Sequence, residues 1–218
     1  MKFRIPWSLS DVLMTLIALS PAIGALLLYN RLPDVLASHF SFDNTANGYM
    51  SKNGSILLLV LLGLVPLLLR LVRYMDPNRA NYEKFSKAYE VARVGTSLIL
   101  AVAGWGMLLY NLNLRLQMNT IICGVIGMLL LVLGNYITQV QPNYTFGIRT
   151  PWTLSNPEVW RKTHRFGGPM MMLGGASGLV GAWVDGVAGA VIFIIGLVIS
   201  VVAPVLYSYL LHRKLNHQ

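Results

Sequence analysis

Long apolar runs alternate with short polar segments along the whole chain. The 218 residues contain six such runs: Val12–Leu28, Ile56–Leu69, Val94–Tyr110, Ile121–Ile137, Phe166–Val184 and Val187–Leu211. A membrane-spanning helix needs roughly 20 predominantly apolar residues. The second run is short, and it reaches that length if Leu71 and Val72 are included and Arg70 extends to the membrane interface. The pattern predicts an all-α fold, a polytopic bundle of six transmembrane helices.

Composition supports a membrane protein over a soluble domain. Charged residues make up 11% of the chain and hydrophobic residues 55%, with a mean hydropathy of +0.59, whereas a soluble domain has about 25% charged residues. Lys2 and Arg4 before an apolar run are also typical of a secretory signal peptide. The run is long for that purpose, so we expect an uncleaved first span. Cys123 has no second cysteine with which to form an intramolecular disulfide.

The distribution of lysine and arginine predicts the orientation in the membrane. Fourteen of these residues fall in the N-terminus, residues 70–93, residues 139–165 and the C-terminus, and only Arg31, Lys52 and Arg115 fall in the segments between them. Short basic segments stay in the cytoplasm. Both termini are therefore predicted to be cytoplasmic, with a long first loop, residues 31–55, outside the cell. The net charge of +9 is explained by topology and needs no nucleic-acid partner.

A long polar segment with a specific sequence separates the fourth and fifth runs. Residues 142–168 read PNYTFGIRTPWTLSNPEVWRKTHRFGG. This segment resembles the signature of the SdpI family of bacterial membrane proteins, and the matching residues are Asn143, residues 146–154, residues 158–160 and residues 162–164. The resemblance implies a multi-pass protein of the bacterial cell membrane that gives immunity to a secreted peptide toxin. In some members it also implies sequestration of a cytoplasmic transcriptional repressor.

The first external loop resembles a second, smaller pattern. Its pairs Leu32-Pro33, His39-Phe40, Gly48-Tyr49 and Ser51-Lys52 are similar to an N-terminal module of unknown function that often precedes the SdpI signature. We therefore divide the chain into residues 1–55, the first span with this loop, and residues 56–218, a five-helix region. Within the loop, His39, Phe40 and Lys52 are the expected functional residues.

A metal site in this loop is an alternative with weak support. Asp34, His39 and Asp43 carry suitable groups, but their spacing fits no strong metal motif. Turn-forming residues, namely Asp43, Asn44, Asn47 and Gly48, favour a polar surface loop instead. We expect no metal and no other cofactor.

The signature segment also predicts local structure. Ser155 and Glu158 have the spacing of a capping box, which predicts a short helix, Asn156–Phe166, lying in the headgroup region with Trp160 as an anchor. Arg149 is placed to bond backbone carbonyls, Glu158 or a lipid phosphate. The expected functional residues are Asn143, Gly147, Arg149, Thr150, Trp152, Glu158, Trp160 and His164. A rigid elbow between two spans would use the same residue types.

Two further patterns concern packing. Asp76-Pro77 reads as a helix start, and an aromatic stripe follows at Tyr82, Phe85 and Tyr89, which suits either packing or a docking face for a cytoplasmic partner. Gly174, Gly178 and Ala182 form a ridge of small residues that permits close helix contact. This ridge favours packing within the bundle, with a homo-oligomer as the alternative.

Three classes of function remain open. An immunity and signalling protein has the lipid bilayer, a secreted peptide toxin and a cytoplasmic transcriptional repressor as its partners. A transporter would need ionisable groups within its spans, and the centres of the six runs contain none. A membrane-embedded enzyme would use His164, Glu158 and Arg149 for acid–base and phosphate chemistry, but the sequence places no nucleophile beside them.

Overall fold

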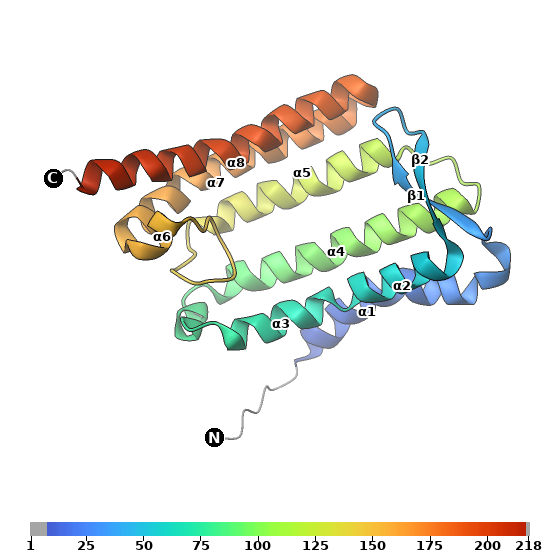
Figure 1. Ribbon diagram of the computed structural model, residues 1–218, viewed down its shortest axis with the longest axis horizontal. Helices are drawn as coiled ribbons and strands as arrows, with labels where there is room; N and C mark the ends of the chain where they lie inside the picture. Colours follow the sequence, from blue (N-terminus) through green and yellow to red (C-terminus); the bar gives the residue numbers. More distant parts are fainter. Residues whose placement is uncertain (1–7, 217–218) are drawn as a thin grey trace. The chain divides into compact units, whose positions relative to one another are not determined.

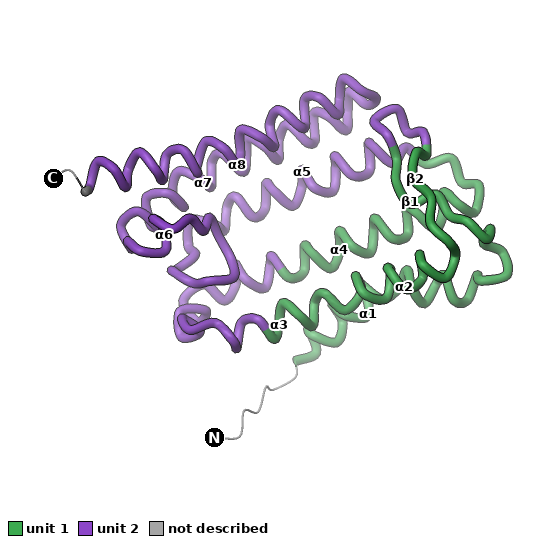
Figure 2. The backbone as a smooth tube through the Cα atoms, viewed as in Figure 1, with its two compact units in different colours: residues 1–40, 46–71, 93–116 green, residues 41–45, 72–92, 117–218 purple. Residues whose placement is uncertain are grey.

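The computed structural model describes residues 8–216 and is mainly helical (Figure 1). Lys2 and Arg4 lie outside the described residues. The elements in chain order are α1 (Leu9–Leu27), η1 (Tyr29–Arg31), β1 (Val35–Phe40), β2 (Ala46–Ser51), α2 (Lys52–Gly63), α3 (Val65–Met75), η2 (Arg79–Glu83), α4 (Ser86–Asn111), α5 (Met118–Ile137), α6 (Pro151–Ser155), α7 (Pro157–Val184) and α8 (Gly186–Asn216). The chain forms two compact units, coloured separately in Figure 2.

Unit 1 comprises residues 1–40, 46–71 and 93–116. Its core contains side chains from α1, the strand segment, α2 and α4, namely Ala22, Ala25, Leu32, Leu36, Leu59, Met107 and Leu108. Small residues allow its helices to approach closely. A Cβ on Gly63 would lie 2.4 Å from the Leu19 side chain, and a Cβ on Gly104 would lie 2.7 Å from that of Pro21. Real Cβ atoms do not approach so closely, so both positions require glycine.

The predicted external loop is a β-hairpin, and this corrects the predicted all-α fold. β1 and β2 pair antiparallel, with Leu36 opposite Met50 and Ala37 opposite Tyr49. Leu36 and Ala37 are buried, which a purely polar surface loop would not require. The expected turn is present at Asn44, whose φ is 64°.

Unit 2 comprises residues 41–45, 72–92 and 117–218. Its helices α5 and α7 cross at glycines: a Cβ on Gly178 would lie 2.7 Å from the Cα of Gly127, and one on Gly175 would lie 2.6 Å from the Gly127 carbonyl oxygen. A Cβ on Gly174 would lie 2.7 Å from the Ser200 side chain on α8. The ridge of small residues therefore serves helix packing within the bundle, as the sequence favoured.

Five segments of the described chain are long and apolar enough to cross a membrane: α1, Lys52–Met75, α4, α5 and Gly186–Leu215. The short second run gains its length because α3 follows α2 directly. α7 covers the predicted fifth span, but its many glycines and Pro169 lower its apolar character. The prediction of six spans therefore stays a prediction.

Candidate functional site

The signature segment folds around the side chain of Asn143, which is fully buried. Its Nδ2 donates to the carbonyl oxygens of Gln141 and Phe146, at 2.8 Å each. Its Oδ1 accepts from the N–H groups of Thr145 at 2.9 Å and Phe146 at 2.6 Å. One amide thus satisfies four backbone groups of a tight loop, which explains why asparagine stands here.

Asp76 joins this loop to residues 72–92, the segment of unit 2 that comes before it in the chain. Its Oδ2 accepts from the Tyr82 hydroxyl and from the N–H of Tyr144, both at 2.8 Å. Burial, together with the hydrogen bond to Asp76, raises the pKa of Tyr82, so the phenol stays protonated. The predicted helix start at Asp76-Pro77 is wrong, because a turn and η2 follow and α4 begins only at Ser86.

The aromatic stripe packs inside unit 2. Tyr82, Phe85 and Tyr89 are all buried and form one cluster with Trp160 and, at its edge, Phe146. The Tyr82 ring centroid lies 4.9 Å from that of Phe85 and 5.0 Å from that of Tyr89. A docking face for a cytoplasmic partner needs accessible side chains, so the packing alternative is the correct one.

Trp160 and His164 form a stacked pair in this core, with ring centroids 4.2 Å apart. The indole Nε1 donates to the carbonyl oxygen of Val140 at 2.8 Å. The prediction of Trp160 as a headgroup anchor is wrong, because its side chain is only 1% exposed. Its hydrogen bond and its stacking instead attach α7 to the end of α5.

His164 uses both ring nitrogens for structure. Nδ1 lies 2.9 Å from the Trp160 carbonyl oxygen, to which it must donate, and Nε2 accepts from the N–H of Ile148 at 3.0 Å. Burial lowers the pKa of His164 to about 4, so the imidazole is neutral at physiological pH. Gly147 passes directly over this ring: its φ is 120°, and a Cβ there would lie 2.5 Å from Nε2. Glycine is therefore required at this position.

The helix starts differ from the predicted capping box. Thr150 caps α6 in a reciprocal pair with Thr153. Asn156 caps α7, and its Oδ1 accepts from the N–H groups of Glu158 at 2.8 Å and Val159 at 3.2 Å. Ser155, the predicted cap, is instead the last residue of α6. The separate helix Asn156–Phe166 is also wrong, because α7 continues without a break to Val184.

Among the remaining residues of the signature segment, which forms an elbow between α5 and α7, Arg149 and Glu158 are exposed and Trp152 is half-buried. The guanidinium of Arg149 donates to the carbonyl oxygen of Tyr144, so the predicted bond to a backbone carbonyl is confirmed. Glu158 pairs with Lys162 at 2.7 Å, and this contact lowers the pKa of the Glu158 carboxyl. Trp152 donates from Nε1 to the Ser208 hydroxyl at 2.5 Å, which attaches α6 to α8.

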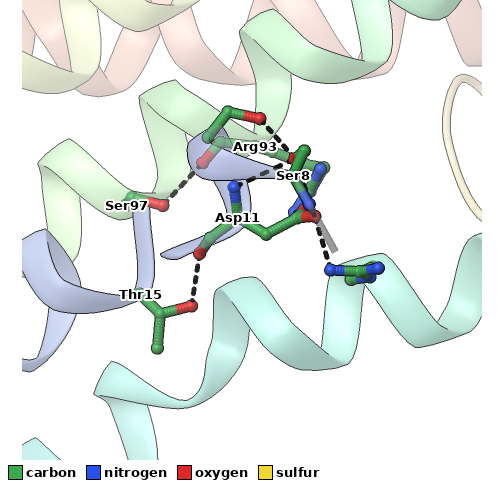
Figure 3. Close-up of polar contacts among 7 residues, drawn as sticks. Ser8, Asp11, Thr15, Arg93 and Ser97 are labelled. Atoms are coloured by element: carbon green, nitrogen blue, oxygen red, sulfur yellow. Dashed lines mark hydrogen bonds and ion pairs between the residues drawn. The ribbon is translucent and has the colours of Figure 1, made fainter. Parts of the chain in front are cut away.

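A buried charged cluster in unit 1 was missed by the sequence interpretation (Figure 3). The Asp11 carboxylate pairs with the guanidinium of Arg70 through Oδ2 and with that of Arg93 through Oδ1, the latter at 2.5 Å. Asp11 also accepts from the N–H and hydroxyl of Ser8, at 2.9 and 2.7 Å. All three charged residues are only 4% exposed. The expectation that Arg70 extends to the membrane interface is therefore wrong.

The three charged residues of this cluster occupy equivalent positions in the sequence. Asp11, Arg70 and Arg93 each stand at the predicted cytoplasmic end of an apolar run. Ionisable groups at the ends of neighbouring spans pair when the helices pack together. This shared position marks the three residues as candidates, and the packing of the helices decides that they pair with one another.

The functional residues expected in the external loop stabilise the hairpin and its flanks. Lys52 Nζ lies 3.1 Å from Asp34 Oδ1 and 4.6 Å from the centre of the Tyr29 ring. His39 Nδ1 bonds the side chain of Asn47 at 2.6 Å. Phe40 packs edge-to-face on Tyr110, with centroids 4.7 Å apart. Within residues 8–216, no group of three His, Cys, Asp or Glu side chains is close enough to hold a metal ion.

Several long apolar helices joined by short basic segments define the class: this chain is a multi-pass protein of the bacterial cell membrane. Residues 139–208 match the SdpI/YfhL protein family, and residues 16–64 match a domain of unknown function, DUF1648. Immunity protein SdpI of Bacillus subtilis (strain 168) is 24% identical over 206 residues, which cover 94% of this chain and 97% of that relative. No solved structure matches the chain.

The resemblance to the SdpI family, with its N-terminal module, is thereby confirmed. The elbow around Asn143 and His164 lies within the matched SdpI region, and the β-hairpin lies within the matched DUF1648 region. Asp11, Arg70 and Arg93 fall outside both matched regions.

Proposed function

We propose that this chain is an integral membrane immunity protein that protects the cell against a secreted peptide toxin. The observation that supports this proposal most directly is the similarity of the chain, over 94% of its length, to a relative named as an immunity protein. The protection does not depend on catalysis. Its structural framework is the membrane bundle, with an outer hairpin module and an inner elbow.

The elbow geometry supports a non-enzymatic role. A general acid or base must reach a proton on the substrate, but both ring nitrogens of His164 are occupied by the backbone. Glu158 is paired with Lys162, and Arg149 bonds the Tyr144 carbonyl. The three candidate catalytic side chains thus each support the fold or a local ion pair.

A transporter has less support than an immunity protein. Transport sites lie near the bilayer midplane, whereas Asp11 lies in the first turn of α1. Its carboxylate is already shared between Arg70 and Arg93. The cluster therefore suits the joining of helix ends more than the passage of an ion.

The proposed topology has six spans with both termini in the cytoplasm, and residues 166–184 of α7 form the fifth span. This topology follows from the distribution of the basic residues. It places the hairpin outside, where a secreted toxin arrives, and the elbow inside. The exposed Arg149 and Glu158 at the elbow are then the signature side chains available to a cytoplasmic partner, such as a transcriptional repressor.

The proposal is tested by expressing this chain in a bacterium that is sensitive to the peptide toxin of an SdpI-type system. We expect these cells to survive a synthetic toxin dose that kills the same strain with an empty vector. The toxin recovered from the medium should have its original mass, because protection does not depend on catalysis. Death at the same dose would contradict immunity, and a cleaved or modified toxin would favour the enzyme alternative.

A further inference from the structure

The two outer edges of the β-hairpin differ in their hydrogen bonding. At the β1 edge, the N–H of Ala37 donates to Oδ1 of Asn111 at 2.8 Å, and Nδ2 of Asn111 donates to the Ala37 carbonyl oxygen at 2.9 Å. A side-chain amide at the end of α4 therefore occupies the place that another strand would take. Folded proteins commonly protect their edge strands in such ways.

The β2 edge is open. Because the backbone of Ala37 faces Asn111, Ala37 and its partner Tyr49 form a non-hydrogen-bonded pair of the ladder. The N–H and C=O of Tyr49 must then also point away from β1. Within residues 8–216 no backbone hydrogen bond from outside the β1–β2 ladder reaches either group, and Tyr49 is 65% exposed. Ser51, opposite Val35, presents its N–H on the same edge.

The side chains along this edge are also suited to contact with an added strand. Val35 and Tyr49 project from the same face of the hairpin. Tyr49 lies opposite Ala37, and Ala37 is two residues from Val35 on β1, so all three side chains point to one side. Both are exposed, Val35 at 56%. An open row of backbone groups beside exposed apolar side chains is the feature to which an extended polypeptide adds as a further strand.

We propose that an extended segment of the secreted peptide toxin binds the outer edge of β2 and adds a third strand to the hairpin. This inference rests on the proposed function and names the contact surface for it. The backbone of Tyr49 supplies one donor and one acceptor, and Ser51 supplies a second donor. Alternate side chains of the bound segment then pack on Val35 and Tyr49.

The test compares Tyr49→Pro with Tyr49→Ala in the survival assay. Proline removes the outward N–H while the inward bonds of Gly48 and Met50 to β1 remain, and it is tolerated on edge strands. Both variants lose the tyrosine ring, and only Tyr49→Pro also loses the N–H. We expect Tyr49→Pro, at normal membrane abundance, to tolerate about ten-fold less toxin than Tyr49→Ala, the equivalent of one hydrogen bond.

Several outcomes would overturn the inference. If the unmodified chain protects and Tyr49→Pro protects as well as Tyr49→Ala, toxin does not bind this edge, although the proposed function stands. If Tyr49→Pro fails to reach the membrane, hydrogen exchange of the purified unmodified chain decides the question. Synthetic toxin should slow exchange at the amides of Tyr49 and Ser51. Unchanged exchange contradicts the inference, and slowing that depends only on protein concentration assigns the edge to a second copy of this chain.

Discussion

Replacing Asp11 with alanine should strongly destabilise the protein. The substitution removes the carboxylate shared by Arg70 and Arg93, two guanidiniums that are only 4% exposed. Removing one partner from a buried ion pair typically costs about 3–5 kcal/mol, because the remaining charge stays in a poorly solvated place. We expect a large fall in the midpoint of thermal unfolding in detergent, and a lower amount of protein in the membrane.

Glu158→Ala is the matched control for this prediction. Glu158 also forms an ion pair, with Lys162, but the two side chains are 47% and 39% exposed. Exposed ion pairs contribute little to stability, so this variant should unfold near the temperature of the unmodified protein. Equal behaviour of the two variants would contradict the structural role of the buried cluster.

Acidification should destabilise the protein through His164. The folded pKa is about 4, whereas an unfolded histidine titrates near 6.5. Between these values the unfolded state binds more protons, so the free energy of unfolding falls as the pH is lowered. The full contribution is present above about pH 6.5 and is lost towards pH 4. The shift corresponds to a total of about 3 kcal/mol.

The control for this effect is His164→Gln. Glutamine can still accept from Ile148 and donate to the Trp160 carbonyl, but it does not titrate. We expect chemical unfolding of this variant to show a shallower pH dependence than the unmodified chain. The difference between the two profiles isolates His164 from the acidic residues, and identical profiles would show that the imidazole is not protected by burial.

The membrane class and the elbow were predictable because their signals are local. The apolar runs are continuous, and the signature motif carries its turn residues and its proline in sequence order. The position of the cap was harder to predict, because Ser155 and Asn156 are adjacent and both are good capping residues. The choice between them depends on where α6 ends, which packing against α8 decides.

The hairpin and the charged cluster were missed for different physical reasons. The strands are short, and register irregularities beside His39 interrupt the alternation that reveals a strand. The cluster joins residues far apart in sequence, since Arg70 and Arg93 lie 59 and 82 positions from Asp11. Each charge alone resembles the ordinary end of a span, and only the packing of three helices brings them together.

The proposed orientation places the hairpin module outside the cell and the elbow in the cytoplasm. Cysteine labelling of intact cells with a membrane-impermeant maleimide tests it, using Phe42→Cys at the hairpin tip and Arg161→Cys on α7. Both positions are exposed, and the native Cys123 is buried, so the unmodified chain serves as the background control. We predict labelling of Phe42→Cys in intact cells and of Arg161→Cys only after the membrane is permeabilised. The reverse pattern would contradict the orientation and, with it, the proposed meeting of the toxin with the hairpin.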